Sequence, residues 1–338
     1  MAGKSLFFDG VSLSKSVQEI SLNGDKPTPE FHVKDCSLGG TGSTHFQSSV
    51  SVPIIDLSLL LSSKDELQKL RLALESGGCF QAIGHGMSSS FIDQGRGVAK
   101  QFFGLPQEEK LKYSRAANGV EGYGHDVVVS EKQVLDWNTR LFLKVFPENQ
   151  RRLNLWPQKP DNFSYELSSY REVLHEYSTK LKQMMDILFK AMAKSLDLEE
   201  NSFSGQFGDN SVMQVRSGVT VLLQDEEVKG LQIVKYEKWI TVPVIPHALV
   251  VNLGDQMQIM SNGIFKSPVH KVVTNMGKLR ISVAMFNEAE PEKEIGPVEA
   301  LIDDQRPRLY RIVKNYASFN YECFQKGKVA LEEVKFHA

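Results

Sequence analysis

The sequence predicts a mixed α/β (α+β) protein in which helices surround an antiparallel sandwich or jelly roll. Two observations lead to this fold class. Apolar residues recur at helical spacing from residue 165 to residue 196, which indicates one long amphipathic helix. After Gly205 the pattern changes to short β-forming runs separated by turn residues. Closely spaced strands with no helix between them favour antiparallel pairing, so we expect the long helix to back a sheet.

In the N-terminal half, strands and helices alternate. Residues 52–57 and 79–83 are each short, apolar and predicted to be strands. Between them, two serines at residues 62–63 precede Lys64, Asp65 and Glu66, which is the pattern of a helix N-cap followed by an acidic first turn. That helix ends at Gly77–Gly78, and residues 87–103 are predicted to form the next one.

In the C-terminal half, seven strands and a helical cover are expected. The helical pattern returns over residues 301–326, where we predict helices that cover one end of the roll. The predicted strands are residues 213–225, 231–234, 239–242, 249–253, 256–261, 269–274 and 279–286.

The chain divides into five segments on these patterns. Residues 1–50 are rich in Ser and Gly and are expected to be a weakly ordered extension. Residues 51–160 form an N-terminal α/β region, and residues 161–205 hold the long backing helix. Residues 206–295 form the jelly roll, here expected to be incomplete, and residues 296–338 the C-terminal helices.

Composition excludes several classes of function. Lys and Arg number 39 against 41 Asp and Glu, so the net charge of −2 provides no field for nucleic acid or an anionic membrane. Three widely spaced cysteines make no disulfide framework, which favours a reducing compartment. No stretch reads as a secretory signal or a membrane span. We therefore expect a cytoplasmic monomer that acts on a small molecule.

The segment from Ser267 to Ala284 contains the most informative chemistry. If residues 275–277 form a three-residue turn, the two flanking runs pair as a hairpin and His270 lies opposite Ser282. Strand alternation then puts Arg280 on the same face. Arg offers a planar fork for a carboxylate, Ser a hydrogen bond and His a neutral nitrogen for iron. A solvated Arg, a strand Ser and a hydrogen-bonded His explain the same spacing more simply, and the spacing alone favours them.

Several stretches in this order resemble the plant 2-oxoglutarate and Fe(II)-dependent dioxygenases. The resemblance is nearest to the subgroup of alkaloid O-demethylases and norcoclaurine-synthase-like proteins, and it extends from about residue 50 to residue 330. It rests on residues 52–57, 78–86, 102–110, 119–124, 135–137, 220–225, 248–266 and 267–282.

This resemblance implies a fold, a site and a reaction. The family fold is a double-stranded β-helix, and its iron is held by two His and one carboxylate, the latter in an H-x-D pair. On the matching positions, His270 is the distal metal ligand, while Arg280 and Ser282 bind the far carboxylate of 2-oxoglutarate. The implied cofactors are Fe(II) and the cosubstrate 2-oxoglutarate, with ascorbate as an optional reductant. The implied reaction is hydroxylation or O-demethylation of a small aromatic specialised metabolite, which yields succinate and CO2.

The H-x-D pair of the family is missing from this chain. None of the eight histidines is followed two residues later by Asp or Glu, and Arg216 leads directly into Ser217 where the family has a strand and the pair. One core strand segment is thus expected to be deleted, and two of the three iron ligands with it. Other candidate ligands have ordinary explanations: His247 and Asp255 as turn residues, and residues 225–227 as a solvated hairpin loop. The resemblance places His85 in a motif that is structural and does not bind metal.

Two functional hypotheses follow, and no catalytic residue is assigned under either. The first is an oxidoreductase of the family. The alternative is a catalytically inactive paralogue, or a splice or gene-model variant, that acts at most as a binding protein. A jelly-roll binding module without any history of iron is disfavoured, because the other motifs of the family are present.

Overall fold

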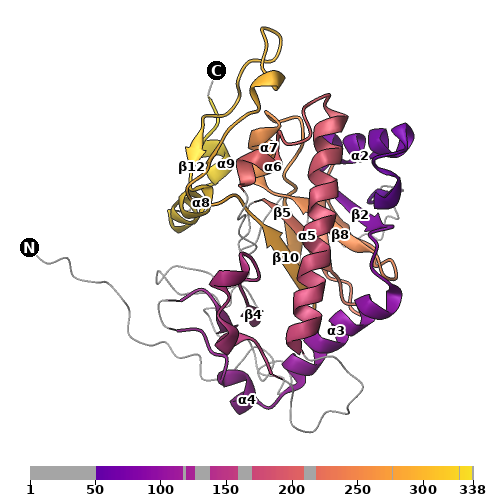
Figure 1. The fold of residues 1–338 in the computed structure, drawn as a ribbon, viewed down its shortest axis with the longest axis vertical. Helices are drawn as coiled ribbons and strands as arrows, with labels where there is room; N and C mark the ends of the chain where they lie inside the picture. Colours follow the sequence, from indigo (N-terminus) through magenta and orange to yellow (C-terminus); the bar gives the residue numbers. More distant parts are fainter. Residues whose placement is uncertain are drawn as a thin grey trace, which may run out of the picture.

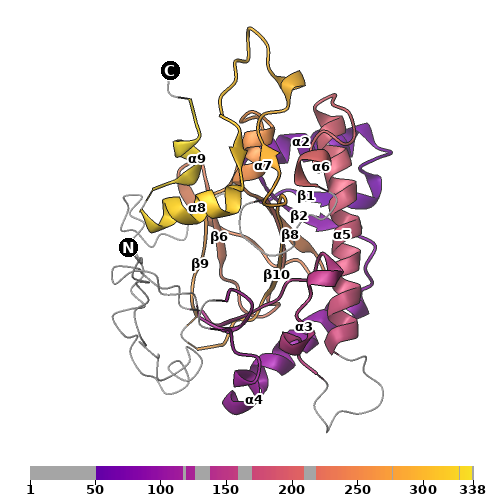
Figure 2. The same ribbon diagram turned by 60° about the vertical axis from the view of Figure 1, so that its left-hand side comes forward.

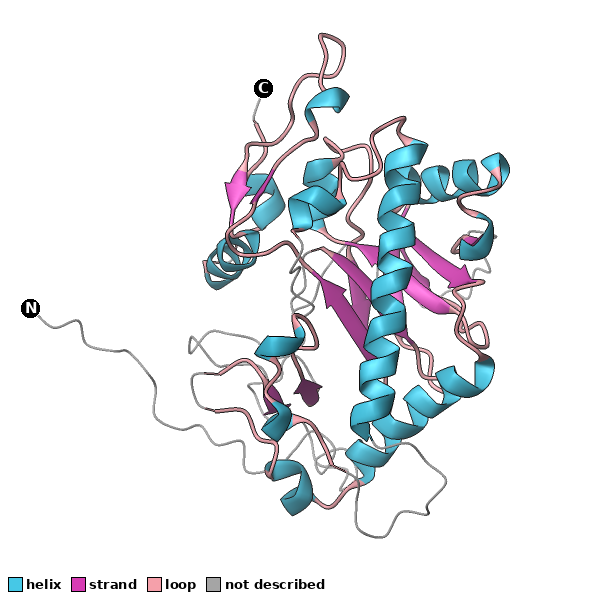
Figure 3. Cartoon of the chain, viewed as in Figure 1, coloured by secondary structure: helices cyan, strands magenta, loops and turns pink. Residues whose placement is uncertain are grey.

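The structure, a computed structural model, describes residues 51–116, 119–125, 138–158, 170–208, 218–275, 277–326 and 328–336. Figures 1 and 3 show a long helix, α5 (Tyr170–Ser195), lying across a sheet with smaller helices at both ends. The elements that precede α5 are β1 (Ile54–Asp56), η2 (Leu57–Leu59), α2 (Lys64–Ser76), β2 (Cys79–Ile83), α3 (Ser89–Gly104), α4 (Gln107–Leu111), β3 (Gly122–Gly124), β4 (Arg140–Phe142), η3 (Glu148–Gln150) and η4 (Leu153–Leu155).

After α5 the chain is mainly β. The elements are α6 (Ser204–Phe207), β5 (Val219–Leu223), β6 (Leu231–Lys235), β7 (Lys238–Thr241), β8 (Leu249–Leu253), α7 (Asp255–Met260), β9 (His270–Val272), β10 (Val283–Asn287), β11 (Glu294–Ile295), η5 (Glu299–Leu301), β12 (Val313–Lys314), α8 (Tyr316–Gln325) and α9 (Ala330–Glu333).

Two sheets form the centre of the molecule. The larger has the strand order β1-β2-β8-β5-β10, and every pair in it except β1–β2 is antiparallel. The smaller has the order β7-β6-β9 and is fully antiparallel. Figure 2 shows β6 and β9 facing β8 and β10 across the middle of the fold. The predicted antiparallel jelly roll with helices outside is confirmed.

Strand alternation gives the larger sheet two buried faces. Val221 of β5 and Val251 of β8 point outward and pack in one cluster with Leu181 and Leu188 of α5. The intervening side chains point inward, into a second cluster that joins the two sheets: Cys79, Leu222, Leu231, Ile233, Val242 and Val250. The long helix therefore backs the sheet as expected, and the space between the sheets is separate from that packing.

The helix signals in the sequence have the expected physical basis. Ser63 is the N-cap of α2, and its Oγ accepts a hydrogen bond from the backbone N–H of Glu66 at 3.2 Å. Helix α5 starts at Tyr170 in the described part of the chain, and residues 165–169 of the predicted helix lie outside it.

One predicted strand is a helix instead. Residues 256–261 were expected to form a strand, but they lie in α7 and the turn that follows it. Gln256, Met257, Ile259 and Met260 are all buried, and a short run that is buried all round has no periodicity to separate a strand from a helix.

The C-terminal helical cover is shorter than predicted, because α8 begins only at Tyr316. Asp303 accepts backbone hydrogen bonds from Gln305 and Arg306, and this turn interrupts the apolar pattern that began at Leu301.

The predicted hairpin between residues 269–274 and 279–286 is also wrong. Strand β9 pairs with β6, whereas β10 pairs with β5, so the two runs lie in different sheets. The chain therefore passes from the smaller sheet to the larger one between β9 and β10. The Arg216–Ser217 junction lies outside the described residues, and the deleted strand stays a prediction.

Among the described helices, none has the length and apolar character needed to cross a bilayer.

Candidate functional site

Strand pairing relates His270 to the inner face of the smaller sheet and Ser282 to the start of β10 in the larger sheet. His270 pairs with Ile233 in the smaller sheet, and Ile233 belongs to the inward-facing cluster. In the larger sheet Ala284 pairs with inward-facing Leu222, and Ser282 lies two residues earlier on the same face. His270 and the Arg280–Ser282 segment therefore come from different sheets, and their convergence on one site stays a prediction.

Arg280 adds a guanidinium next to Ser282. Its Nη1 donates to the Ser282 Oγ at 3.3 Å, while its Nε and Nη2 are buried and have no partner among the residues that the structure describes. Nε and Nη2 lie on one edge of the guanidinium and together form the two-donor fork that binds a carboxylate. Burial lowers the pKa of Arg280, an effect that the negative charge of Asp225 partly offsets. A half-buried cation with two buried donors that lack a described partner is the feature expected of an anion site.

Gly230, just before β6, gives Arg280 room to enter. A Cβ at this position would lie 2.9 Å from the Arg280 Cδ and 2.9 Å from the Val273 carbonyl oxygen. His270 pairs with Ile233, which follows Gly230 by three residues. At the rise of a β-strand, the Cα atoms of Gly230 and Ile233 are about 10 Å apart. Arg280 therefore lies beside the start of β6, and His270 is paired further along the same strand.

His270 itself is exposed, and its Nδ1 lies 3.0 Å from the Pro268 carbonyl oxygen. Because a carbonyl only accepts, Nδ1 carries the proton and Nε2 keeps the lone pair that a metal would need. Over the described ranges, the group of His, Cys, Asp and Glu side chains close enough to hold an ion does not include His270. Together with the absent H-x-D pair, one imidazole is too few ligands, and the residues present do not fit the iron centre of the family.

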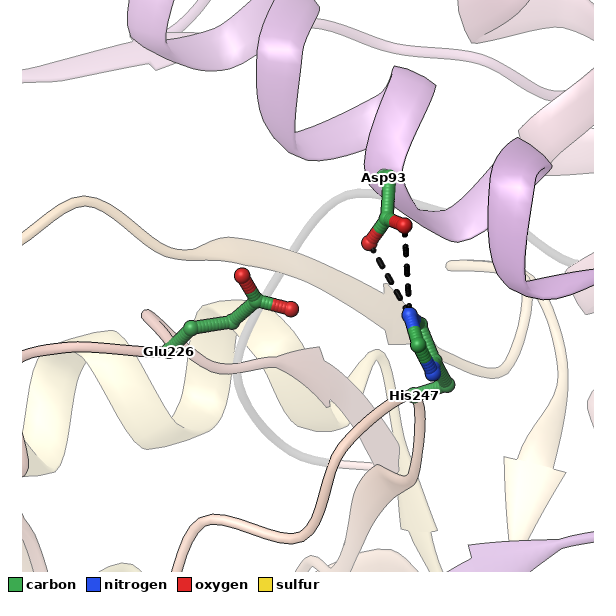
Figure 4. A group of neighbouring side chains, drawn as sticks. All are labelled: Asp93, Glu226 and His247. Carbon is green, nitrogen blue, oxygen red and sulfur yellow. Dashed lines mark hydrogen bonds and ion pairs between the residues drawn. The ribbon is translucent and has the colours of Figure 1, made fainter.

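That other group consists of Asp93 on α3, Glu226 after β5 and His247 before β8, with ligand atoms within 4.8 Å of one another. In Figure 4, Asp93 and His247 point at each other, and the His247 Nε2 lies 3.1 and 3.2 Å from the two carboxylate oxygens. Arg96 Nη1 bonds to both Asp93 and Glu226, and its Nε donates to the Gln224 carbonyl oxygen. Since one guanidinium already bonds to both carboxylates and the imidazole bonds to Asp93, this group is an ion-pair network that joins α3 to two loops.

Other candidate ligands also have structural partners. His85, expected to be structural, accepts from the Met87 N–H and donates through Nε2 to the His247 carbonyl oxygen at 2.9 Å. Asp255 opens α7 and accepts from the Tyr316 hydroxyl. Asp225, expected in a solvated hairpin loop, is only 4% exposed. That expectation is wrong, because β5 and β6 belong to different sheets and the loop between them packs against the interior.

Comparison with known proteins identifies the lineage of this site. The N-terminal region of the non-haem dioxygenases of morphine synthesis matches residues 52–159, and the 2OG-Fe(II) oxygenase superfamily matches residues 210–289. Jasmonate-induced oxygenase 4 of Arabidopsis thaliana is 31% identical over 94% of this chain and 95% of its own length. The chain belongs to the 2OG-Fe(II) oxygenases. Fe(II) and 2-oxoglutarate are the cofactors of this family.

Further relatives place the chain among plant oxygenases of this family. Codeine O-demethylase of Papaver somniferum is 35% identical over 77% of this chain and 78% of its own. The crystal structure of JOX2 in complex with 2OG, Fe and JA superposes with a TM-score of 0.81, at 29% identity over 96% of this chain and 98% of the other. The alignment with the Arabidopsis oxygenase spans 344 positions, more than the 338 residues of the whole chain, so that relative has residues that this one lacks.

The sequence did not reveal two contributors to the site. Gly230 contacts Arg280 fifty positions away, and Asp225 contacts Ile281 over a similar separation. The only local signal for Asp225 was its place two residues before Glu227, where Asp commonly accepts a backbone hydrogen bond in a turn.

Proposed function

We propose that this chain binds 2-oxoglutarate, with the carboxylate remote from its keto group held by Arg280 and Ser282. The observation that supports this most is the buried Nε–Nη2 edge of Arg280, which has no partner among the described residues. A carboxylate would fill both donor positions in one bidentate contact and would offset a buried charge. The Ser282 hydroxyl, which already accepts from Arg280 Nη1, retains a proton that it can donate to the same ligand.

Oxidation of a substrate requires an iron centre, for which this chain supplies too few ligands. Iron in this family supplies the oxidising chemistry, and His270 is the sole residue assigned to it here. We therefore propose that the chain in this form holds the cosubstrate without turnover. The reaction of the lineage, hydroxylation or O-demethylation of a small aromatic metabolite, is proposed for a chain that carries the missing segment. Relatives named codeine O-demethylase and thebaine 6-O-demethylase support that substrate class.

The cellular location, oligomeric state and classes of partner are proposed from the composition of the chain. A net charge of −2 and three widely spaced cysteines support a cytoplasmic monomer with no nucleic-acid or membrane partner. Cys79 and Cys323 are free and buried, as expected where no disulfide framework forms.

Equilibrium dialysis with labelled 2-oxoglutarate in metal-free buffer tests the binding proposal. We expect saturable binding at one site per chain, and succinate, which lacks the keto group, should compete because it carries the same remote carboxylate. Absence of saturable binding would refute the proposal.

A second measurement tests the absence of turnover. The protein is loaded with Fe(II) under anaerobic conditions, desalted, analysed for metal and then exposed to oxygen with ascorbate. We expect iron well below one per chain and no succinate above background. Stoichiometric iron with succinate formation would show that other residues complete the metal site. Sequencing the transcript across the codons for Arg216 and Ser217 shows whether an in-frame segment is omitted there, and a chain with that segment restored is the positive control.

A further inference from the structure

Asp225 is a buried carboxylate that bonds to two separate stretches of the chain. Its Oδ1 accepts from the backbone N–H of Glu227 at 2.9 Å and of Val228 at 3.0 Å, which closes the turn after β5. Its Oδ2 accepts from the backbone N–H of Ile281 at 2.9 Å, fifty-six positions further along the sequence. The residue is 4% exposed, so these hydrogen bonds are shielded from water.

The position of Ile281 makes this contact important. Ile281 lies between Arg280 and Ser282, and it precedes the first paired residue of β10, Val283. Residues 280–282 therefore have no strand partner in the larger sheet, and in the described structure the bond to Asp225 anchors their backbone. Fixing the N–H of the central residue fixes the Cα positions from which both flanking side chains start. A shift of this backbone would separate the guanidinium from the Ser282 hydroxyl, which are already 3.3 Å apart.

The charge of Asp225 has a second effect on the same site. Arg280 loses solvation on burial, and the nearby carboxylate is the group that offsets this. Asp225 thus stabilises the guanidinium while the anion site is empty. For an anionic ligand, however, the same charge is repulsive, so removal of the charge alone would tighten the binding of a dicarboxylate.

We propose that Asp225 is a positioning residue for the 2-oxoglutarate site, which holds the Arg280–Ser282 segment in its binding geometry through the Ile281 N–H. This inference rests on the proposed function. Its two effects on affinity have opposite signs: loss of positioning weakens binding, whereas loss of charge strengthens it. The direction of the change therefore separates the positioning role from simple electrostatics.

The test compares Asp225→Asn with Glu227→Gln. Asparagine keeps one oxygen for the turn but presents an amide NH2 to the Ile281 N–H, so the bond that anchors the segment is lost. Glu227→Gln removes one charge from the same loop and leaves the Asp225 bonds in place. We expect Asp225→Asn to weaken the binding of labelled 2-oxoglutarate about tenfold or more, since a bidentate charged contact depends steeply on geometry. Glu227→Gln should bind as well as the wild type or more tightly.

Hydrogen exchange supplies a measurement that does not depend on the ligand. The Ile281 amide should be protected in the wild type, and Asp225→Asn should lose protection over residues 278–283 while α5 and β8 keep theirs. Asp225→Ser, whose hydroxyl still closes the turn but is too short to reach Ile281, should behave in the same way if Asp225→Asn folds poorly. Unchanged exchange at residues 278–283, or affinity in Asp225→Asn equal to or above that of the wild type, would overturn the inference. Failure of the wild type to bind 2-oxoglutarate would instead refute the proposed function and leave the exchange result to decide the role of Asp225.

Discussion

Replacing Arg280 by Met should make the ligand-free protein more stable and abolish 2-oxoglutarate binding. The guanidinium carries two buried N–H groups without partners, and each such group costs about 1–3 kcal/mol of desolvation. Methionine removes that cost and fills similar volume with an apolar chain. Against this stand the loss of the bond to Ser282 and of the attraction to Asp225, each about 1 kcal/mol. Because Arg280 is only half-buried, we expect a net gain of about 1–2 kcal/mol.

Urea unfolding followed by circular dichroism measures this change. In wild-type protein, 2-oxoglutarate at one hundred times its dissociation constant should add about 2.7 kcal/mol to the free energy of unfolding, whereas the variant should show no shift. Lys229→Met removes one exposed positive charge near the same site and should change stability by less than about 0.5 kcal/mol. A variant less stable than the wild type without ligand, or one still stabilised by 2-oxoglutarate, would refute the anion-site interpretation of the unpaired donors.

Three further outcomes are expected. Gly230→Ala places a methyl group 2.9 Å from the Arg280 Cδ. It should lower the free energy of unfolding in urea by about 1–3 kcal/mol and weaken 2-oxoglutarate binding in dialysis. Unchanged affinity would mean that Arg280 does not bind the ligand. Burial acts to raise the pKa of Asp225, but hydrogen bonds from three backbone N–H groups outweigh it, and the pKa is lowered. The stabilisation by the Asp225 carboxylate is therefore complete above the unfolded-state pKa of about 3.9 and is lost as pH falls through the folded value. The free energy of unfolding, measured from about pH 6 to pH 3, should fall more steeply for the wild type than for Asp225→Asn. Parallel curves would contradict this. Leu181→Ala, at a fully buried site on α5, should lower the free energy of unfolding by about 2–5 kcal/mol, and a loss below about 1 kcal/mol would mean that α5 is not packed on the sheet as described.

The faces of the strands could be predicted from the sequence, whereas their partners could not. Alternation alone predicts that Arg280 and Ser282 share a side; the structure ends the strand at Val283 but keeps the Arg280 Nη1 within 3.3 Å of the Ser282 Oγ. The pairing of His270 with Ser282 was derived from a tight turn, but the connection crosses between two sheets, and local spacing is the same for a hairpin and a crossover. The error concerned a long-range choice of strand partner, which no local pattern in the two runs specifies.

Length and periodicity in the sequence determined the long helix α5, the capped start of α2 and the succession of short strands, because these depend on contacts between near neighbours. The absence of an H-x-D pair is likewise a property of the sequence alone. Tertiary structure decided which sheet each strand joins, the burial of Asp225 and the empty donor edge of Arg280. These depend on groups about fifty positions apart in the chain that meet only when the two sheets pack, and no local pattern records such a meeting.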